Sequence, residues 1–95
     1  MRAPAIIALL LAGCATSEEF ARKNGEFDHG ANVAVVYFRS SLEEVRWKCL
    51  NQMALACAAY SYDPQAPCYI YHSASAGPTV LEHEALHCRY GRWHG

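Results

Sequence analysis

The stretch 79–94 reads TVLEHEALHCRYGRWH, and it decides the fold because it specifies a helix that carries two histidines on one face. His83 and His87 lie four residues apart, so their imidazole rings stand one above the other on a helix and can reach a single metal ion. Glu84 follows the first histidine and projects beside such an ion, where a carboxylate can take a proton from bound water. HEALH is therefore an HExxH motif, which predicts a zinc site with Glu84 as its general base.

The sequence also indicates where this helix begins and ends. Thr79 and Glu82 form a T-x-x-E capping box, and Pro78 before them prevents the helix from extending towards the amino terminus. Gly91 follows Tyr90 and favours a left-handed stop. We therefore expect a helix that is capped by Thr79 and ends at Tyr90.

The third ligand of the site is expected to be His94. A catalytic zinc ion needs three protein ligands and an open position for water, and Gly91 allows the chain to reverse so that His94 returns towards the pair. The segment from His83 to His94 resembles the zincin metallopeptidases and, more loosely, the metzincin pattern HExxHxxGxxH, although three residues separate His87 from Gly91 where that pattern has two. It is also similar to small bacterial and prophage-type lipoproteins that end in HExxHC followed by a glycine and an aromatic-His pair.

Two further parts of a peptidase site are expected. By resemblance to zincins, residues 68–73 are the counterpart of the strand that holds an extended substrate through main-chain pairing. A phenol near the zinc ion can donate a hydrogen bond to the developing oxyanion, and the candidates are Tyr71 and Tyr90. The residues do not choose between these two tyrosines. The alternative role for such rings is to cover a thin core.

Residues 1–13 are typical of a bacterial lipoprotein signal peptide, with a positive start, a short apolar run and small residues before a cysteine. This lipobox-like end implies that Cys14 becomes the lipidated first residue, which would anchor the protein in the membrane. Ala15 in the next position favours the outer membrane facing the periplasm. Residues 14–32 are polar and are expected to form a tether for a domain at 33–95. The alternatives are an ordinary secretory signal or a buried amino-terminal segment.

The other cysteines predict a disulfide framework. Export supplies an oxidising compartment, and a domain of this size has a thin core that benefits from covalent links. Three pairings are possible, and the sequence alone does not choose among them. We favour Cys49 with Cys57 and Cys68 with Cys88. The second pair would tie the histidine helix to the strand before it.

The rest of the chain predicts a small α+β domain. The continuous apolar run 33–38 favours a strand that is buried on both faces and central in its sheet. A capping box at Ser41 and apolar residues at helical spacing predict a helix over about 42–51. Residues 56–62 and 68–73 flank a proline-rich turn and should pair as a hairpin. We expect an antiparallel sheet of about three strands with the histidine helix packed on it.

The function that these patterns favour is a membrane-tethered zinc peptidase of the bacterial cell envelope, with Zn²⁺ as cofactor and a peptide or protein as substrate. The alternative is a non-catalytic envelope lipoprotein in which zinc and disulfides stabilise a small partner-binding domain. A third reading is binding alone, with the histidines incidental. The net charge of −1 and the scattered basic residues argue against a nucleic-acid partner.

Overall fold

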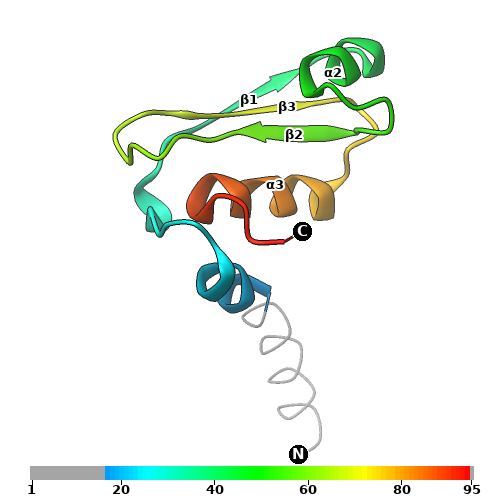
Figure 1. Ribbon diagram of the computed structural model, residues 1–95. Helices are drawn as coiled ribbons and strands as arrows, with labels where there is room; N and C mark the ends of the chain where they lie inside the picture. Colours follow the sequence, from blue (N-terminus) through cyan, green and yellow to red (C-terminus); the bar gives the residue numbers. More distant parts are fainter. Residues whose placement is uncertain (1–16, 95) are drawn as a thin grey trace, which may run out of the picture.

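The computed structural model describes residues 17–94, so that the expected signal peptide and Cys14 lie outside the described residues. A three-stranded sheet has one helix on each face (Figure 1). After helical residues 17–24, the elements follow in the order η1 (Gly30–Asn32), β1 (Val35–Arg39), α2 (Leu42–Cys49), β2 (Ala56–Ala59), β3 (Cys68–His72) and α3 (Pro78–Tyr90). The α+β class and the carboxy-terminal helix against the sheet are confirmed.

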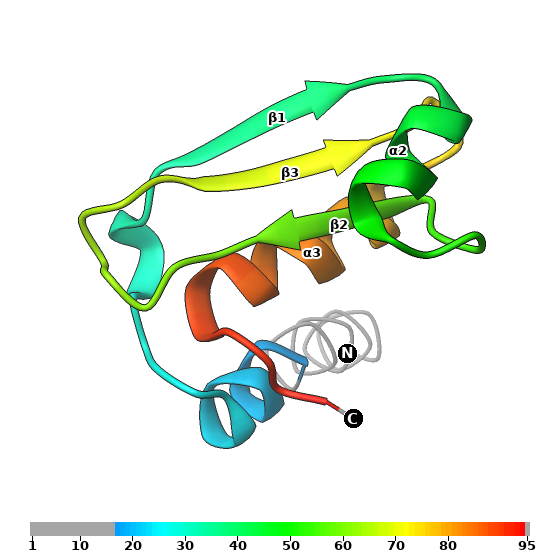
Figure 2. The same cartoon turned by 45° about the horizontal axis from the view of Figure 1, so that its top comes forward.

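The sheet is mixed, with strand order β1-β3-β2 (Figure 2). β2 and β3 form the expected antiparallel hairpin, but β1 runs parallel to β3. The prediction of an all-antiparallel sheet with a central first strand was therefore wrong. α2 takes the chain from β1 to β2 at the opposite edge of the sheet. β3 turns back from β2 into the central position, where it runs in the same direction as β1. β1 is then an edge strand whose Val36, Tyr37 and Phe38 are exposed.

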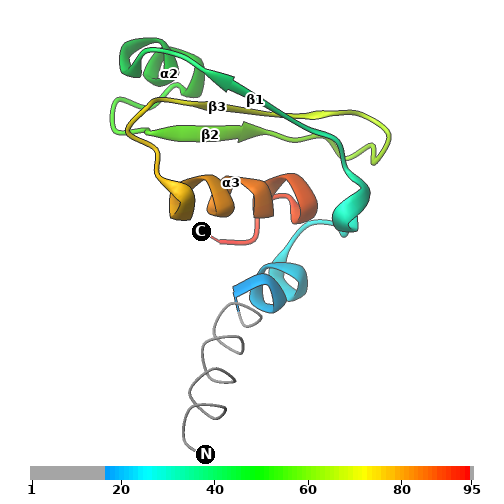
Figure 3. The same ribbon diagram turned by 180° about the vertical axis from the view of Figure 1, so that it is seen from behind.

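α3 packs beneath β2 and β3, and the main core lies between them (Figure 3). Ile70 at the centre of β3 is completely buried, and Cys68 on the same strand is joined to Cys88 of α3 by a disulfide. Side chains on alternate positions of a strand point to opposite faces, so Cys68 and Ile70 face α3 together. The disulfide thus fixes the histidine helix to the central strand, in agreement with the favoured pairing.

α2 covers the opposite face of the sheet. Its first turn is capped by the Ser41 hydroxyl, which accepts a hydrogen bond from the backbone N–H of Glu44, as the capping box predicts. The helix ends at Cys49, where a disulfide to Cys57 of β2 confirms the other favoured pair. Leu50 follows in a left-handed conformation with φ 52°. Only Val45 of this helix is buried.

The start of α3 differs from the capping prediction. Gly77 is the N-cap, without a side-chain hydrogen bond, and Pro78 is already the first helical residue. Proline suits this position because its fixed φ is helical and the N–H it lacks would have no partner inside the helix. Thr79 therefore lies within the helix and caps nothing. The helix end at Tyr90 is confirmed, but Gly91 has φ 74° and ψ −144°, which is a positive-φ conformation and not the expected left-handed one.

Part of the expected tether packs against the domain. Ala21 is completely buried against Leu86 and Tyr90 of α3, in a second small core cluster. Glu18 makes an ion pair with Arg89 at 3.1 Å. Residues of the expected tether thus contact α3 of the domain predicted at 33–95. Within 17–94, no helix combines the length and apolar character needed to cross a bilayer.

Candidate metal centre

Two histidines of α3 converge with a third from the segment that follows the helix. The Nε2 atom of His94 lies 2.9 Å from that of His83 and 3.0 Å from that of His87, and the last two are 3.3 Å apart. Nitrogens bound at 2.0–2.1 Å to one tetrahedral zinc ion lie about 3.3 Å from one another, so the observed triangle has nearly the dimensions of a metal site. Among the described residues this is the group that could hold a metal ion. The expected ligand set is thus brought together.

Local structure explains this convergence. Helical spacing places His83 and His87 on the same face of α3. The glycine stop then reverses the chain, with the Gly91 N–H donating to the carbonyl oxygen of His87 at 2.8 Å. This turn brings the segment that carries His94 back alongside α3, and Figure 1 shows the course of this red segment. The Gly-x-x-His spacing was therefore a sound guide to the third position.

A backbone contact orients the ring of His87. Its Nδ1 lies 2.8 Å from the carbonyl oxygen of Gly91, and a carbonyl can only accept, so the proton is on Nδ1. The lone pair is then on Nε2, which points to the other two imidazoles. Hydrogen bonds of this kind fix the tautomer and ring orientation of metal-binding histidines. Gly91 therefore both reverses the chain and orients the ring of His87.

The surroundings of His83 and His87 favour their neutral imidazole forms. Burial, with a smaller contribution from the neighbouring histidines, lowers the pKa of His83. Burial also lowers the pKa of His87, against an opposing effect of its hydrogen bond to Gly91. A metal ion binds the neutral ring, so a lowered pKa leaves these nitrogens available at neutral pH.

Glu84 lies between α3 and the sheet. Burial raises the pKa of its carboxyl group to about 7, while the charge of His94 and a backbone hydrogen bond from Ala58 of β2 act in the opposite direction. A carboxyl group with a pKa near neutrality can both accept and release a proton at pH 7. The charge of Glu84 therefore changes close to neutral pH.

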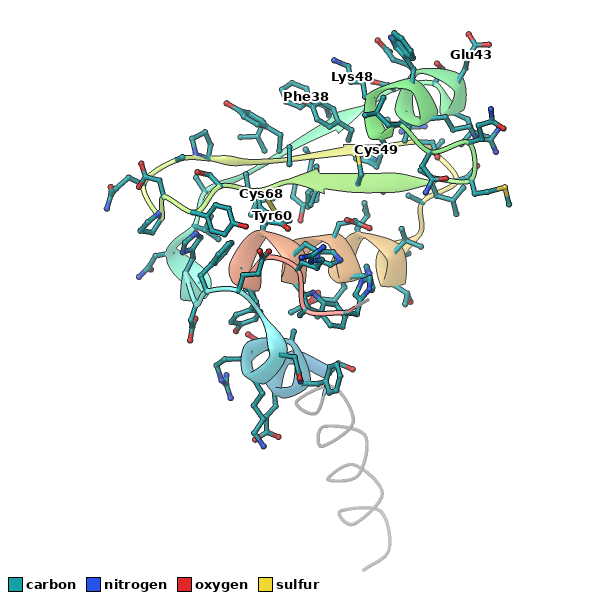
Figure 4. The ribbon with its side chains drawn as sticks, viewed as in Figure 1. Phe38, Glu43, Lys48, Cys49, Tyr60 and Cys68 are labelled. Carbon is teal, nitrogen blue, oxygen red and sulfur yellow. A yellow bond between two sulfur atoms is a disulfide. The ribbon has the colours of Figure 1, made fainter. Side chains whose placement is uncertain are left out.

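The structure does not bring the two predicted oxyanion donors to the histidines. The hydroxyl group of Tyr90 donates to Glu18 at 2.8 Å. Tyr71 lies on the α2 face, where its ring stacks on Phe38 and the Lys48 ammonium lies over it (Figure 4). Those predictions rested on residue type alone. Residue type does not reveal which side of a sheet Tyr71 lies on or which group the hydroxyl of Tyr90 contacts.

Sequence reasoning missed the tyrosine nearest the site. The Tyr60 ring lies almost parallel to that of His87, with centroids 6.5 Å apart, and its hydroxyl group donates to Glu26 at 2.9 Å. Tyr60 is on the α3 side of the sheet in Figure 4. Tyr60 and Tyr62 alternate in the sequence and so can share a face of an extended segment, but nothing in the sequence links that face to Glu26.

A groove of about 370 Å³ lies beside the triad. His83 and Trp93 line it at one end, and the ring of Trp93 also stacks on His87 with centroids 5.3 Å apart. The indole N–H of Trp93 is buried, with no hydrogen-bond partner in the part of the chain that the structure describes. The remaining lining comes from α3 and from one residue of the amino-terminal helical segment, namely Pro78, Thr79, Glu82, Leu86 and Ser17.

Comparison with known proteins yields no match to a family model, to a curated protein or to a solved structure. The resemblance to zincins therefore stays a prediction that depends on the motif.

Proposed function

We propose that this chain is a zinc-dependent peptidase of the bacterial cell envelope, anchored to the membrane through Cys14. The observation that carries the proposal is the convergence of three Nε2 atoms with no fourth protein ligand among residues 17–94. Catalytic zinc sites have three protein ligands and an open position, whereas structural sites have four. Bound zinc would supply Lewis acidity and a water molecule with a pKa of about 7.

The disulfides support a functional role for the metal. All four cysteines of the described domain are paired, so no thiolate remains as a further ligand. One of these bridges already fixes α3 to the sheet. A metal ion is therefore not needed to hold the histidine helix in place, which favours a site retained for chemistry.

Glu84 is the residue that we assign to proton transfer. It follows His83 on α3 and is partly buried against β2. In the proposed reaction its carboxylate takes a proton from the attacking water and passes it to the leaving amine. The histidines hold the metal, and the groove beside His83 offers space for a substrate side chain.

β2 is a better candidate than β3 for holding an extended substrate. β3 is the central strand and is paired on both sides, so its main chain has no free edge. β2 is an edge strand, and it packs next to α3. An extended peptide can add to such an edge by main-chain hydrogen bonds. This transfers the role that the sequence suggested for residues 68–73 to Ala56–Ala59.

A second candidate function is binding of a partner without catalysis. The observation in its favour is a group of exposed apolar side chains at the α2 end of the molecule, formed by Trp47, Leu50 and Met53, which are 76%, 85% and 82% exposed. Side chains of this kind at a surface favour a contact with another molecule. In that case the metal ion would only stabilise the opposite end of the fold.

The substitution Glu84→Gln separates the two functions. Under the peptidase proposal, the variant keeps one zinc ion per chain and loses at least about 100-fold in the rate of cleavage of a pool of internally quenched random peptides, because the general base is gone. The matched control is Glu44→Gln on α2, which should cleave at the wild-type rate. Zinc-loaded wild-type protein that cleaves no peptide in the pool, or a Gln variant that cleaves normally, would overturn the proposal.

A further inference from the structure

The segment that precedes η1 covers the carboxy-terminal end of α3. The backbone N–H of Glu26 donates to the carbonyl oxygen of Tyr90 at 2.8 Å, and that of His29 donates to the carbonyl oxygen of Arg89 at 2.8 Å. The last carbonyls of a helix lack partners within the helix and must be satisfied from outside. Here the partners come from a distant part of the chain. The amino-terminal segment is thus attached to the turn that leads to His94.

The Glu26 side chain continues this contact beyond the helix end. Its Oε1 accepts a hydrogen bond from the backbone N–H of Arg92 at 2.7 Å and another from the Tyr60 hydroxyl at 2.9 Å. Its Oε2 accepts one from the Tyr62 hydroxyl at 2.6 Å. Hydrogen bonds to an ionised carboxylate are roughly twice as strong as those between neutral groups. One side chain therefore joins the β2–β3 connection to the turn between Gly91 and His94.

The Glu26 side chain is exposed, but the two segments beside it approach each other closely. A Cβ atom at Gly91 would come within 2.9 Å of Glu26 Oε1 and 2.8 Å of a ring carbon of Phe27. A Cβ atom at Gly25 would overlap the carbonyl oxygen of Tyr90. Both glycines are therefore required by close approach, and Gly91 also by its positive φ. The two segments fit against each other with little freedom to shift.

The contacts of Glu26 lead to two of the three histidines. Arg92 is two residues before His94, so fixing its N–H limits where the final imidazole can lie. The ring of Tyr60, whose hydroxyl group donates to Glu26, is stacked on His87. We propose that Glu26 is a positioning residue, which holds the turn after α3 so that His94 meets His83 and His87 before a metal ion arrives. This inference rests on the metal centre of the proposed function and not on catalysis.

The physical reason for such a residue is the flexibility of a ligand that lies outside a helix. A histidine outside a helix must lose conformational entropy when it binds a metal ion, and this loss weakens binding. A ligand that is already in place avoids most of the loss. Residues that orient metal ligands from behind typically change metal affinity by about 10–100-fold when they are replaced.

The test compares Glu26→Ala with Glu18→Ala. Glu18 is a fair control because it too is a glutamate of the amino-terminal segment that accepts hydrogen bonds from α3 side chains, Arg89 and Tyr90, but it does not contact the turn with His94. Zinc affinity is measured by competition with a chromophoric chelator. We expect Glu26→Ala to weaken zinc binding about 10–100-fold and Glu18→Ala to change it by less than about 3-fold.

A double-mutant cycle shows whether Glu26 acts through the third ligand. In a His94→Ala background the added Glu26→Ala change should have almost no effect on zinc affinity, because the residue that it positions is absent. A general loss of stability would instead weaken binding equally in both backgrounds. Glu26→Gln should restore part of the affinity, since an amide oxygen still accepts the Arg92 N–H.

Two further results complete the test. Tyr62→Phe removes a single hydrogen bond to Glu26 and should weaken zinc binding less than Glu26→Ala does, while leaving the fold intact. Equal zinc affinity of wild type and Glu26→Ala would overturn the inference and leave the metal centre standing. Failure of the wild-type chain to bind zinc would overturn the metal centre itself and the role of Glu26 with it.

Discussion

The two faces of the sheet differ in what they cover and in how they are held. On the α3 face, Ile70 and the Cys68–Cys88 disulfide form a closed core, and polar groups from three separate segments meet around the histidines. On the α2 face only Val45 of the helix is buried, and the Cys49–Cys57 disulfide joins two partly exposed segments. The first face is organised around a site, whereas the second supports the fold and leaves apolar side chains in solvent.

The contrast between the two faces indicates where rigidity is needed. A set of metal ligands must be held within about half an ångström of the correct geometry, which requires support from packed neighbours. The α3 face provides such support through the buried disulfide, the turn at Gly91 and the Glu26 contacts. No comparable network surrounds Trp47 on the other face in the described part of the chain. Changes on the two faces should therefore affect metal binding unequally.

The largest effect is expected from removing the two disulfides in turn. The Cys68–Cys88 bridge spans 20 residues and the Cys49–Cys57 bridge spans 8, which in the chain-entropy description corresponds to about 3 and about 2.5 kcal/mol. Both sulfurs of the first bridge are also buried in the core, so replacing them with alanine leaves a cavity. We expect Cys68→Ala/Cys88→Ala to cost about 4–5 kcal/mol in urea unfolding, against about 2–3 kcal/mol for Cys49→Ala/Cys57→Ala.

The same two variants should differ in zinc affinity. Loss of the bridge to α3 should weaken zinc binding, because the histidine helix is then less firmly attached to the sheet. Loss of the bridge to α2 should leave the affinity within about 2-fold of wild type, since that bridge lies far from the histidines. Equal weakening by both variants would show that the two faces are not independent.

A smaller effect is expected from Ser41→Ala on the α2 face. The hydroxyl group of Ser41 caps the helix by accepting the Glu44 N–H at 3.2 Å. Loss of such a cap costs about 1 kcal/mol. Chemical unfolding should show this loss, while zinc affinity in the same preparation stays at the wild-type value. A change in affinity that exceeds the change in stability would contradict the separation of the two faces.

The parts of the site that were predictable are those fixed by local spacing. Two histidines four apart on a helix must share a face. The Gly-x-x-His spacing after the helix brings His94 back to them. The hairpin followed from its proline-rich turn. These features depend on residues close together in the chain, where geometry leaves few choices.

The parts that were missed depend on contacts between distant segments. Glu26 meets Tyr60, Tyr62 and Arg92 across separations of 34, 36 and 66 residues, and no local pattern indicates such a meeting. The place of β1 at the sheet edge was missed because an apolar run resembles a buried central strand until the strand order is known. The capping box expected at the start of α3 was wrong for a local reason. Pro78 is itself the first helical residue, so Thr79 lies inside the helix and cannot cap it.

The central claim is that the three imidazoles hold one zinc ion with one position open. The most direct measurement is the zinc content and X-ray absorption spectrum of the protein, purified without chelator. The account predicts one zinc ion per chain, with three nitrogens at about 2.0–2.1 Å and a single additional oxygen from water. Less than about a tenth of an equivalent of zinc, or four protein ligands around it, would contradict the account.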